Sequence, residues 1–340
     1  MNVRYRFALF SLVAGLVGIA WLGHAPTAAV LSSPSSPAPR LSVHDRRGVY
    51  LTAYAASQGA LFEDVLDNLV RHGLDTVVVD VKNNHGEVCY ASDVPLAREI
   101  GAVKRLLDLS ALVGAVHARG LYIIARLVVF YDPFLARYLG VSSAPWVLPT
   151  VSAATSYNLD LAAEVERAGF DEIQFDYIRF PDDGPIGPDY TERCQAVEAF
   201  LARAGERLTL PISADVYGRV TFPWNARRID PIGQHLEGIA QWVDAVSPMV
   251  YPSHYVEQAF KDDPYRTVLQ ATRDAVGRAS IAVRPYLQAF DMALPSGMTL
   301  PAYIAAQIRA VEDAGADGYL FWNPRSDYTA LWQALAQRPR

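Results

Sequence analysis

The sequence predicts a single (β/α)8 barrel (a TIM barrel), because short β-branched or aromatic runs alternate with amphipathic helical stretches from residue 48 to residue 336. This alternation is typical of βαβ units and therefore of a parallel sheet. Eight such units over this length match the usual size of the barrel. A doubly wound sheet is the alternative, but no GxGxxG follows the first strand and the sequence contains no P-loop.

The first half of the barrel follows from the apolar periodicity. The first predicted strand covers 48–54, and the helix after it carries Leu61, Val65 and Leu69 on one face and ends at Gly73. The second strand covers 76–82 and is followed by a polar loop at 83–87. A helix over 106–118, a third strand over 121–130 and a helix over 159–168 complete this half.

The fourth strand begins after Gly169, and Pro181 marks its end because proline has no N–H to donate to a neighbouring strand. Side chains alternate along a strand, so Gln174 and Asp176 are expected on one face and Phe175 and Tyr177 on the other. The remaining predicted strands cover 212–216, 245–251, 281–287 and 318–322, and the helices between and after them include 191–204, 265–276, 302–314 and 330–335.

Residues 1–29 are predicted to be a signal peptide or an uncleaved signal anchor. Arg4 and Arg6 precede an apolar run over 7–22, and the small residues at 25–29 resemble a cleavage site. The run is long for a signal peptide and shorter than the roughly 20 residues of a membrane span, so both alternatives stay open. Residues 30–47 are predicted to be a Ser/Pro-rich linker. We therefore expect an exported protein, extracellular or periplasmic, or anchored to the outer face of the cytoplasmic membrane.

Composition limits the possible partners. The sequence is 51% hydrophobic and 19% charged, as expected of a globular protein with a large core. It has 30 basic and 36 acidic residues without a basic run, which argues against nucleic acid as a partner. The seven histidines form no HxH or HExxH, so neither a metal nor a cofactor is predicted. Cys89 and Cys194 could form one disulfide in an oxidising compartment, but their positions on different predicted elements do not favour it.

Carboxylates are predicted at the catalytic face. In a barrel of this kind the active site lies at the carboxyl ends of the strands, where Asp176 and Asp215 end adjacent strands and Asp80 ends another. Two neighbouring carboxyl groups can divide into an acid and an ionised partner. Each has a structural alternative: Asp176 capping the next loop or pairing with Arg179, Asp80 pairing with Lys82 on a shared face, and Asp215 capping the following turn.

The same strand ends carry aromatic, cationic and amide side chains, a combination suited to stacking on sugar rings and binding their hydroxyl groups. Two of the cations, Arg126 and Arg284, are expected mainly as partners of the carboxylates. The predicted substrate-binding residues are Tyr50, Lys82, Arg126, Arg179, Tyr217, Tyr251, His254, Arg284, Tyr286, Trp322 and Asn323.

The stretch FDEIQFDYIRFP at 170–181 resembles the hallmark of a bacterial glycosyl-hydrolase-like family that is catalogued as a domain of unknown function. The motifs VDVK at 79–82, SADVYG at 213–218, SPMVYPSHY at 247–255 and WNP at 322–324 agree with it in the same order, so the resemblance covers roughly residues 48 to 330. It implies a TIM-barrel glycosidase in which Asp176 is the nucleophile or base and Asp215 the general acid/base. Leu148 stands where the resemblance leads us to expect Asp.

Two hypotheses follow for function. The first is an exported glycoside hydrolase that cleaves a polysaccharide or oligosaccharide of the cell envelope or an extracellular matrix by a two-carboxylate mechanism. The alternative is a non-catalytic barrel of the cell envelope that binds glycan. The presence of both Asp176 and Asp215 favours catalysis, because a binding module needs neither.

Overall fold

The computed structural model of the protein describes residues 42–182 and 188–338. The predicted leader and most of the predicted linker therefore lie outside the described residues. Within them, no helix has the length and apolar character needed to cross a membrane. Cys89 and Cys194 are both buried and free.

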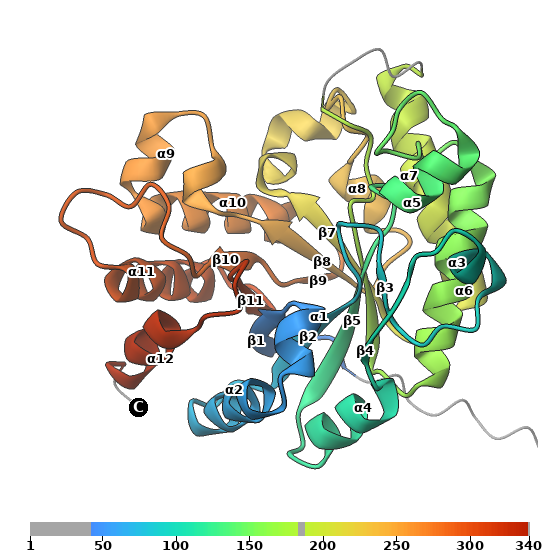
Figure 1. The fold of residues 1–340 in the computed structure, drawn as a ribbon. Coiled ribbons are helices and arrows are strands. Elements are labelled where there is room, and N and C mark those ends of the chain that lie inside the picture. The colour runs from blue at the N-terminus through green and yellow to red at the C-terminus, as the bar shows by residue number, and fades with distance from the viewer. Residues whose placement is uncertain (1–41, 183–187, 339–340) are drawn as a thin grey trace, which may run out of the picture. The chain divides into compact units, whose positions relative to one another are not determined.

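Eight strand positions close into a parallel barrel, as the sequence predicts (Figure 1). Each strand pairs in parallel with the next, and β11 pairs with β1 to close the sheet. The seventh position is divided in two, and Pro285, which has no N–H to donate, lies in the break. The strands are β1 (Arg46–Leu51), β2 (Thr76–Lys82), β5 (Tyr122–Val128), β6 (Glu172–Asp176), β7 (Ile212–Tyr217), β8 (Ala245–Met249), β9 (Ala282–Val283) with β10 (Tyr286–Gln288), and β11 (Gly318–Trp322).

Helices surround this sheet and cover its outer face (Figure 1). Their apolar stripes pack on the outward side chains of the strands; Phe200 of α7, for example, makes edge contacts with Phe175 of β6 and with Phe130. The longer helices are α2 (Gly59–Arg71), α4 (Leu109–His117), α6 (Ser152–Arg167), α7 (Tyr190–Arg207), α10 (Pro264–Arg278), α11 (Leu300–Asp313) and α12 (Thr329–Ala336). The shorter ones are α1 (Ala53–Ser57), α3 (Pro95–Glu99), α5 (Pro133–Leu139), α8 (Leu236–Ile239) and α9 (Gln258–Asp262).

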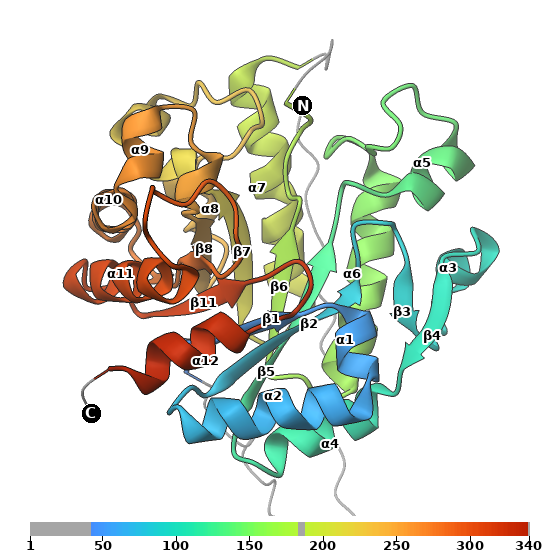
Figure 2. The same ribbon diagram turned by 60° about the vertical axis from the view of Figure 1, so that its left-hand side comes forward.

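The connection from β2 to α4 differs from the prediction. β3 (Val88–Tyr90) pairs antiparallel with the end of β2, and β4 (Val103–Leu107) pairs with β3, so the connection extends the sheet beside the barrel (Figure 2). The predicted helix over 106–118 is wrong at its start, because its first residues belong to β4 and Asp108 caps α4 by accepting from the backbone N–H of Ala111. The first predicted strand likewise ends at Leu51, where Thr52 caps α1.

The barrel interior is layered and combines polar pairs with a separate apolar cluster that includes Val78, Ile124 and Leu320. Glu172, Gln174 and Asp176 of β6 all point inward, while Phe175 faces the helices, as the alternation predicts. Tyr177 does not follow the alternation, because its φ of 54° turns the chain out of the strand. The inward positions thus place Asp176 at the carboxyl end of the barrel.

Candidate active site

One guanidinium, Arg126 of β5, joins the carboxylates predicted from three strands. It is only 3% exposed. Its Nη1 donates to Oδ1 of Asp80 at 2.5 Å, and its Nε and Nη2 both donate to Oδ2 of Asp176, at 3.1 and 2.5 Å. Oδ2 of Asp215 lies 3.8 Å from its Nε. The strand register explains the meeting, because Arg126 lies opposite Asp80 on β2 and Gln174 on β6.

Asp176 is held from its own loop as well. Its Oδ1 accepts a hydrogen bond of 2.6 Å from the backbone N–H of Tyr177, which lies in the left-handed region with φ 54°. Such a conformation costs a non-glycine residue about 1 kcal/mol or more and is typical of functional sites. Asp176 does not pair with Arg179, which donates instead to the carbonyl of Phe180 and to Asp182.

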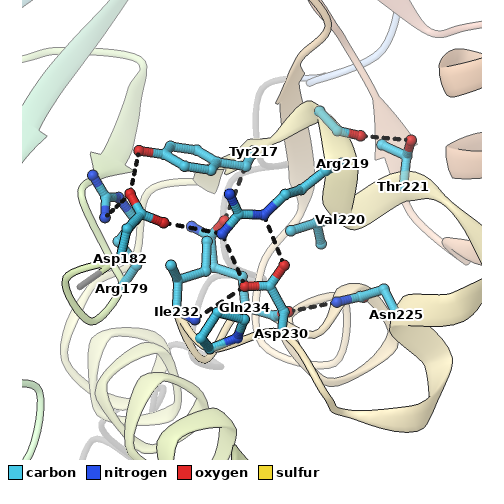
Figure 3. Close-up of polar contacts among 12 residues, drawn as sticks. Arg179, Asp182, Tyr217, Arg219, Val220, Thr221, Asn225, Asp230, Ile232 and Gln234 are labelled. Carbon is cyan, nitrogen blue, oxygen red and sulfur yellow. Dashed lines mark hydrogen bonds and ion pairs between the residues drawn. The ribbon is translucent and has the colours of Figure 1, made fainter. Parts of the chain in front are cut away.

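Asp215 is positioned by the segment after β7, whose residues Asn225 and Gln234 are drawn in Figure 3. The Gln234 side chain donates to the carbonyl oxygen of Asp215 at 3.2 Å and accepts from the backbone N–H of Tyr217 at 2.9 Å. Asn225 in turn donates to the carbonyl of Gln234 at 2.8 Å. The backbone on both sides of Asp215 is therefore fixed by one amide.

The carboxyl groups have different electrostatic settings. Burial raises the pKa of Asp215 well above its ordinary value, and the neighbouring Asp176 raises it further. Oδ1 of Asp215 has no hydrogen-bond partner among the described residues. Burial also raises the pKa of Asp80, although Arg126 and the hydroxyl of Tyr50 oppose the shift. Asp215 is thus favoured as a protonated acid, while Asp176 faces a cation.

Two adjoining cavities among the described residues open at this end of the barrel. Asp176 and Asp215 line the first, which has a volume of about 330 Å³. Asp80 lines the second, of about 520 Å³, together with the loop after β2. The two cavities share Arg126, Tyr177 and Trp322. The predicted residues Arg179, Tyr217, Tyr251, His254 and Tyr286 also line the first cavity, and Tyr50 lines the second.

Lys82 lies elsewhere. The pairing of β2 with β5 shifts register between Asp80 and Lys82, so the two side chains do not share a face and that expectation was wrong. Nζ of Lys82 instead lies 2.8 Å from Oδ2 of Asp132 and donates to the carbonyl of Val128 at 2.7 Å. It is a buried structural cation beside the site rather than a residue that lines it.

Two further predicted residues line neither cavity. Arg284 donates to both oxygens of Glu172, at 3.0 and 2.5 Å, two layers below Asp176 along β6. Its hydrogen-bond partner is therefore a carboxylate below the site, and its charge opposes the rise that burial causes in the pKa of Asp215. Asn323 donates to the carbonyl oxygens of Ala289 and Asp327 and so fixes the loop after β11.

Sequence analysis missed several lining residues. Arg219 lines the first cavity and is held by Asp182 and Asp230 (Figure 3). Tyr177 lines both cavities. Tyr54, which the sequence places at the end of the first predicted strand, lines the second. The sequence offers a signal for Arg219, because this residue directly follows Tyr217 and Gly218 at the end of a predicted strand. No sequence pattern signals the left-handed turn that brings in Tyr177.

The described residues contain no group of three or more His, Cys, Asp or Glu side chains arranged to hold a metal ion. The site is instead a set of carboxyl groups around one arginine, with aromatic walls, at the carboxyl end of a (β/α)8 barrel. Fold and site together place the protein in the class of carboxylate-bearing TIM barrels.

The chain belongs to the family described as "Putative glycosyl hydrolase domain", whose model matches residues 48–328. This confirms the resemblance found in the motifs and, at the level of the family, the prediction of a glycosyl hydrolase domain. No curated protein matches the chain.

Solved structures agree on the fold. The glycoside hydrolase domain of PgaB (BpsB) from Bordetella bronchiseptica is 14% identical with a TM-score of 0.61, over 86% of this chain and 99% of that chain. An endo-1,4-beta-mannanase from Rhizomucor miehei is 12% identical with a TM-score of 0.61, over 87% and 96%. A hypothetical protein from Ruminiclostridium thermocellum is 33% identical over 49% of this chain and 97% of that chain, with a TM-score of 0.46. The first two likenesses show a shared barrel fold.

Proposed function

We propose that the protein is an exported glycoside hydrolase that cleaves the glycosidic bonds of a polysaccharide. One observation carries the proposal: Asp176 at the end of β6 and Asp215 near the end of the adjacent β7 line the same cavity in contrasting settings. Asp176 is bound by Arg126, whereas burial raises the pKa of Asp215. A pair of carboxyl groups, one of which supplies a proton, is the common machinery of glycosidic bond hydrolysis.

In the proposed reaction Asp215 is the general acid that donates its proton to the leaving glycosidic oxygen. Asp176 is the nucleophile or the base, and the guanidinium of Arg126 together with the N–H of Tyr177 fixes its orientation. Aromatic side chains in the cavity, among them Tyr217, Tyr251 and Tyr286, provide the flat walls that suit sugar rings. The family and the glycoside hydrolases of similar fold support this assignment.

A non-catalytic glycan-binding barrel is the second candidate, and one observation favours it. Arg126 donates twice to one oxygen of Asp176 and once to Asp80, which is how a buried structural ion cluster is built. Asp215 argues the other way, because an acid buried with one oxygen unsatisfied among the described residues costs stability without an evident structural gain.

Reducing-sugar release from a panel of bacterial envelope polysaccharides and exopolysaccharides tests the proposal. Asp176→Asn keeps the side-chain shape and removes its charge, so it should abolish release while glycan binding persists. Asp160→Asn, an exposed substitution on α6 outside both cavities, is the matched control and should retain full release. Equal binding by wild type and Asp176→Asn with release by neither would favour the glycan-binding barrel.

Export is proposed from residues 1–29 alone. Expression of the full chain, followed by fractionation and mass spectrometry of its N-terminus, would distinguish the two forms of export. A chain beginning near residue 30 in the periplasm or medium indicates a cleaved signal peptide, and an intact chain in the membrane fraction indicates an anchor. An intact chain in the cytoplasm would contradict export.

A further inference from the structure

We propose that the second cavity is a sugar-binding subsite, so that a glycan chain extends from the carboxylate pair across Arg126 and Trp322 into the region bounded by Tyr54 and the loop at 83–87. The units it takes are uncharged or amino sugars rather than uronic acids. The inference rests on the proposed function, because it assumes that the first cavity also receives a glycan.

Continuity between the cavities supports the proposal. Arg126, Tyr177 and Trp322 line both, and two of them, Arg126 and Tyr177, donate hydrogen bonds to Asp176. The volumes of about 330 and 520 Å³ both lie in the range of small-molecule sites. A glycan unit at Asp176 and Asp215 would therefore place the next unit of its chain at this shared boundary.

Tyr54 is the free aromatic ring of the second cavity. It projects from α1, directly after β1, and is 68% exposed although it lines the cavity. Trp322, by contrast, is already stacked on Tyr50 at 3.7 Å between ring centroids, with the guanidinium of Arg126 4.8 Å from its own centroid. An exposed aromatic ring at a cavity mouth can stack on a sugar face, and the 43%-exposed Leu106 of β4 adds apolar surface beside it.

The loop at 83–87 forms another wall of the second cavity, and hydrogen bonds within the loop fix its conformation. The side-chain oxygen of Asn83 accepts from the backbone N–H groups of His85 and Glu87, and its amide donates to the carboxylate of Glu87 at 3.0 Å. Gly86 adopts a φ of 77°, and a Cβ there would approach Oδ1 of Asp132 to 2.7 Å. A loop fixed in this way leaves the exposed side chains of Asn84 and His85 at the cavity, where they can exchange hydrogen bonds with sugar hydroxyl groups at little entropic cost.

Charge selects the kind of sugar. Among the described residues that line the second cavity, Asp80 and Glu87 are acidic and Arg126 is the one Lys or Arg side chain. The N–H groups of Arg126 already serve Asp80 and Asp176. A carboxylate or sulfate on the ligand would thus lie near Glu87 without an unpaired Lys or Arg among the described lining residues. A hydroxyl, an acetamido or an ammonium group would meet no such repulsion.

A glycan microarray probed with the Asp176→Asn protein tests the subsite, compared with the same protein carrying Tyr54→Ala, Tyr54→Phe or Tyr138→Ala. Tyr138 is an exposed tyrosine on α5 outside both cavities, so it is the matched control. We expect bound glycans of four or more neutral or amino sugars, a loss of at least fivefold in signal for Tyr54→Ala, and retention for the Phe and control variants. Disaccharide signals should not depend on Tyr54.

Signals that are indifferent to Tyr54→Ala, a preference for uronic acid chains, or no bound glycan at all would overturn the subsite. Its failure is separable from that of the proposed function. Glycan hydrolysis that Tyr54→Ala leaves unchanged would retain the hydrolase and remove the subsite. Glycan binding that depends on Tyr54, without hydrolysis by the wild type, would retain the subsite and remove the hydrolase.

Discussion

Asp215 is costly to bury, and the cost has a defined pH dependence. Because burial and Asp176 raise its pKa in the folded protein, the native state holds this proton at pH values where the unfolded chain has released it. The free energy of unfolding therefore falls as the pH rises from the ordinary range of an aspartate, until the pH passes the pKa in the folded state, and it is flat above that. Each pH unit within this window costs about 1.4 kcal/mol.

The Asp215→Asn variant should consequently be more stable than the wild type above pH 4, by an amount that grows with pH across the window. At about pH 2.5 and below, where Asp215 is protonated in both states because the pKa of an unfolded aspartate is about 3.9, the difference should shrink to the intrinsic effect of the amide. Urea unfolding of both proteins at a series of pH values measures this difference in the free energy of unfolding. A constant difference at every pH would show that the folded protein does not retain the Asp215 proton.

Arg126 is the residue on which the other charges depend. It is surrounded by Asp80, Asp176 and Asp215 in a buried setting, and removing one partner of such a cluster leaves uncompensated buried charge. We expect Arg126→Leu to destabilise the protein by about 3–5 kcal/mol at pH 7. Arg207→Leu, which removes an exposed pair with Asp160, should cost at most about 1 kcal/mol. Chemical denaturation of both variants gives the comparison, and equal small effects would refute the cluster.

Among the elements, the segment after β7 has the most direct influence on the site. Gln234 satisfies the carbonyl of Asp215 and the N–H of Tyr217 (Figure 3). Gln234→Ala would leave both backbone groups without this partner, at a cost of about 1–3 kcal/mol in stability.

The same change removes the hydrogen bonds that fix the backbone on both sides of Asp215. Gln234→Ala should therefore also lower kcat on the glycan substrate more than it raises KM. Gln241→Ala provides the control, since that exposed glutamine bonds only the carbonyl of Glu237 among the described contacts. Kinetics and unfolding measured on both proteins make the test. A Gln234→Ala enzyme with unchanged kcat would show that Asp215 needs no positioning from this segment.

The barrel itself was predictable from the sequence because its strands are buried on both faces and read as β-branched runs, as in Thr76–Lys82. The positions of Asp176 and Asp215 followed from the same pattern, since a residue at the end of a parallel strand must reach the carboxyl face. Arg126 followed because it lies on a neighbouring strand of the same sheet.

What could not be predicted depends on irregular backbone. The register shift that turns Lys82 away from Asp80 needs one extra residue in one strand, and no residue type marks it. The turn at Tyr177 lies in a conformation that side chains other than glycine rarely adopt. The predicted helix at 106–118 includes the last two residues of β4, because no glycine or proline separates Val103–Leu107 from the helix that follows.

At the scale of the whole barrel, three inward layers along β6 explain why the chemistry lies where it does. Glu172 with Arg284 and Gln174 with Tyr286 fill the interior below the site with bonded polar pairs. Of the three inward residues of β6, Asp176 is the one that lines a cavity, and Tyr286 reaches the first cavity from the layer below. The lower pairs are expected to contribute to stability and the top layer to function, which is the usual division in this fold.

The measurement that tests the central claim most directly is glycan hydrolysis as a function of pH by the wild type, Asp176→Asn and Asp215→Asn. The account predicts a wild-type rate that falls on the alkaline side as Asp215 loses its proton. It also predicts that the rate of hydrolysis falls by about 10²-fold or more in each variant. Any activity that Asp215→Asn retains should show no decline on the alkaline side. Variants that hydrolyse at wild-type rates, or a wild type that binds glycan and cleaves none at any pH, would contradict it.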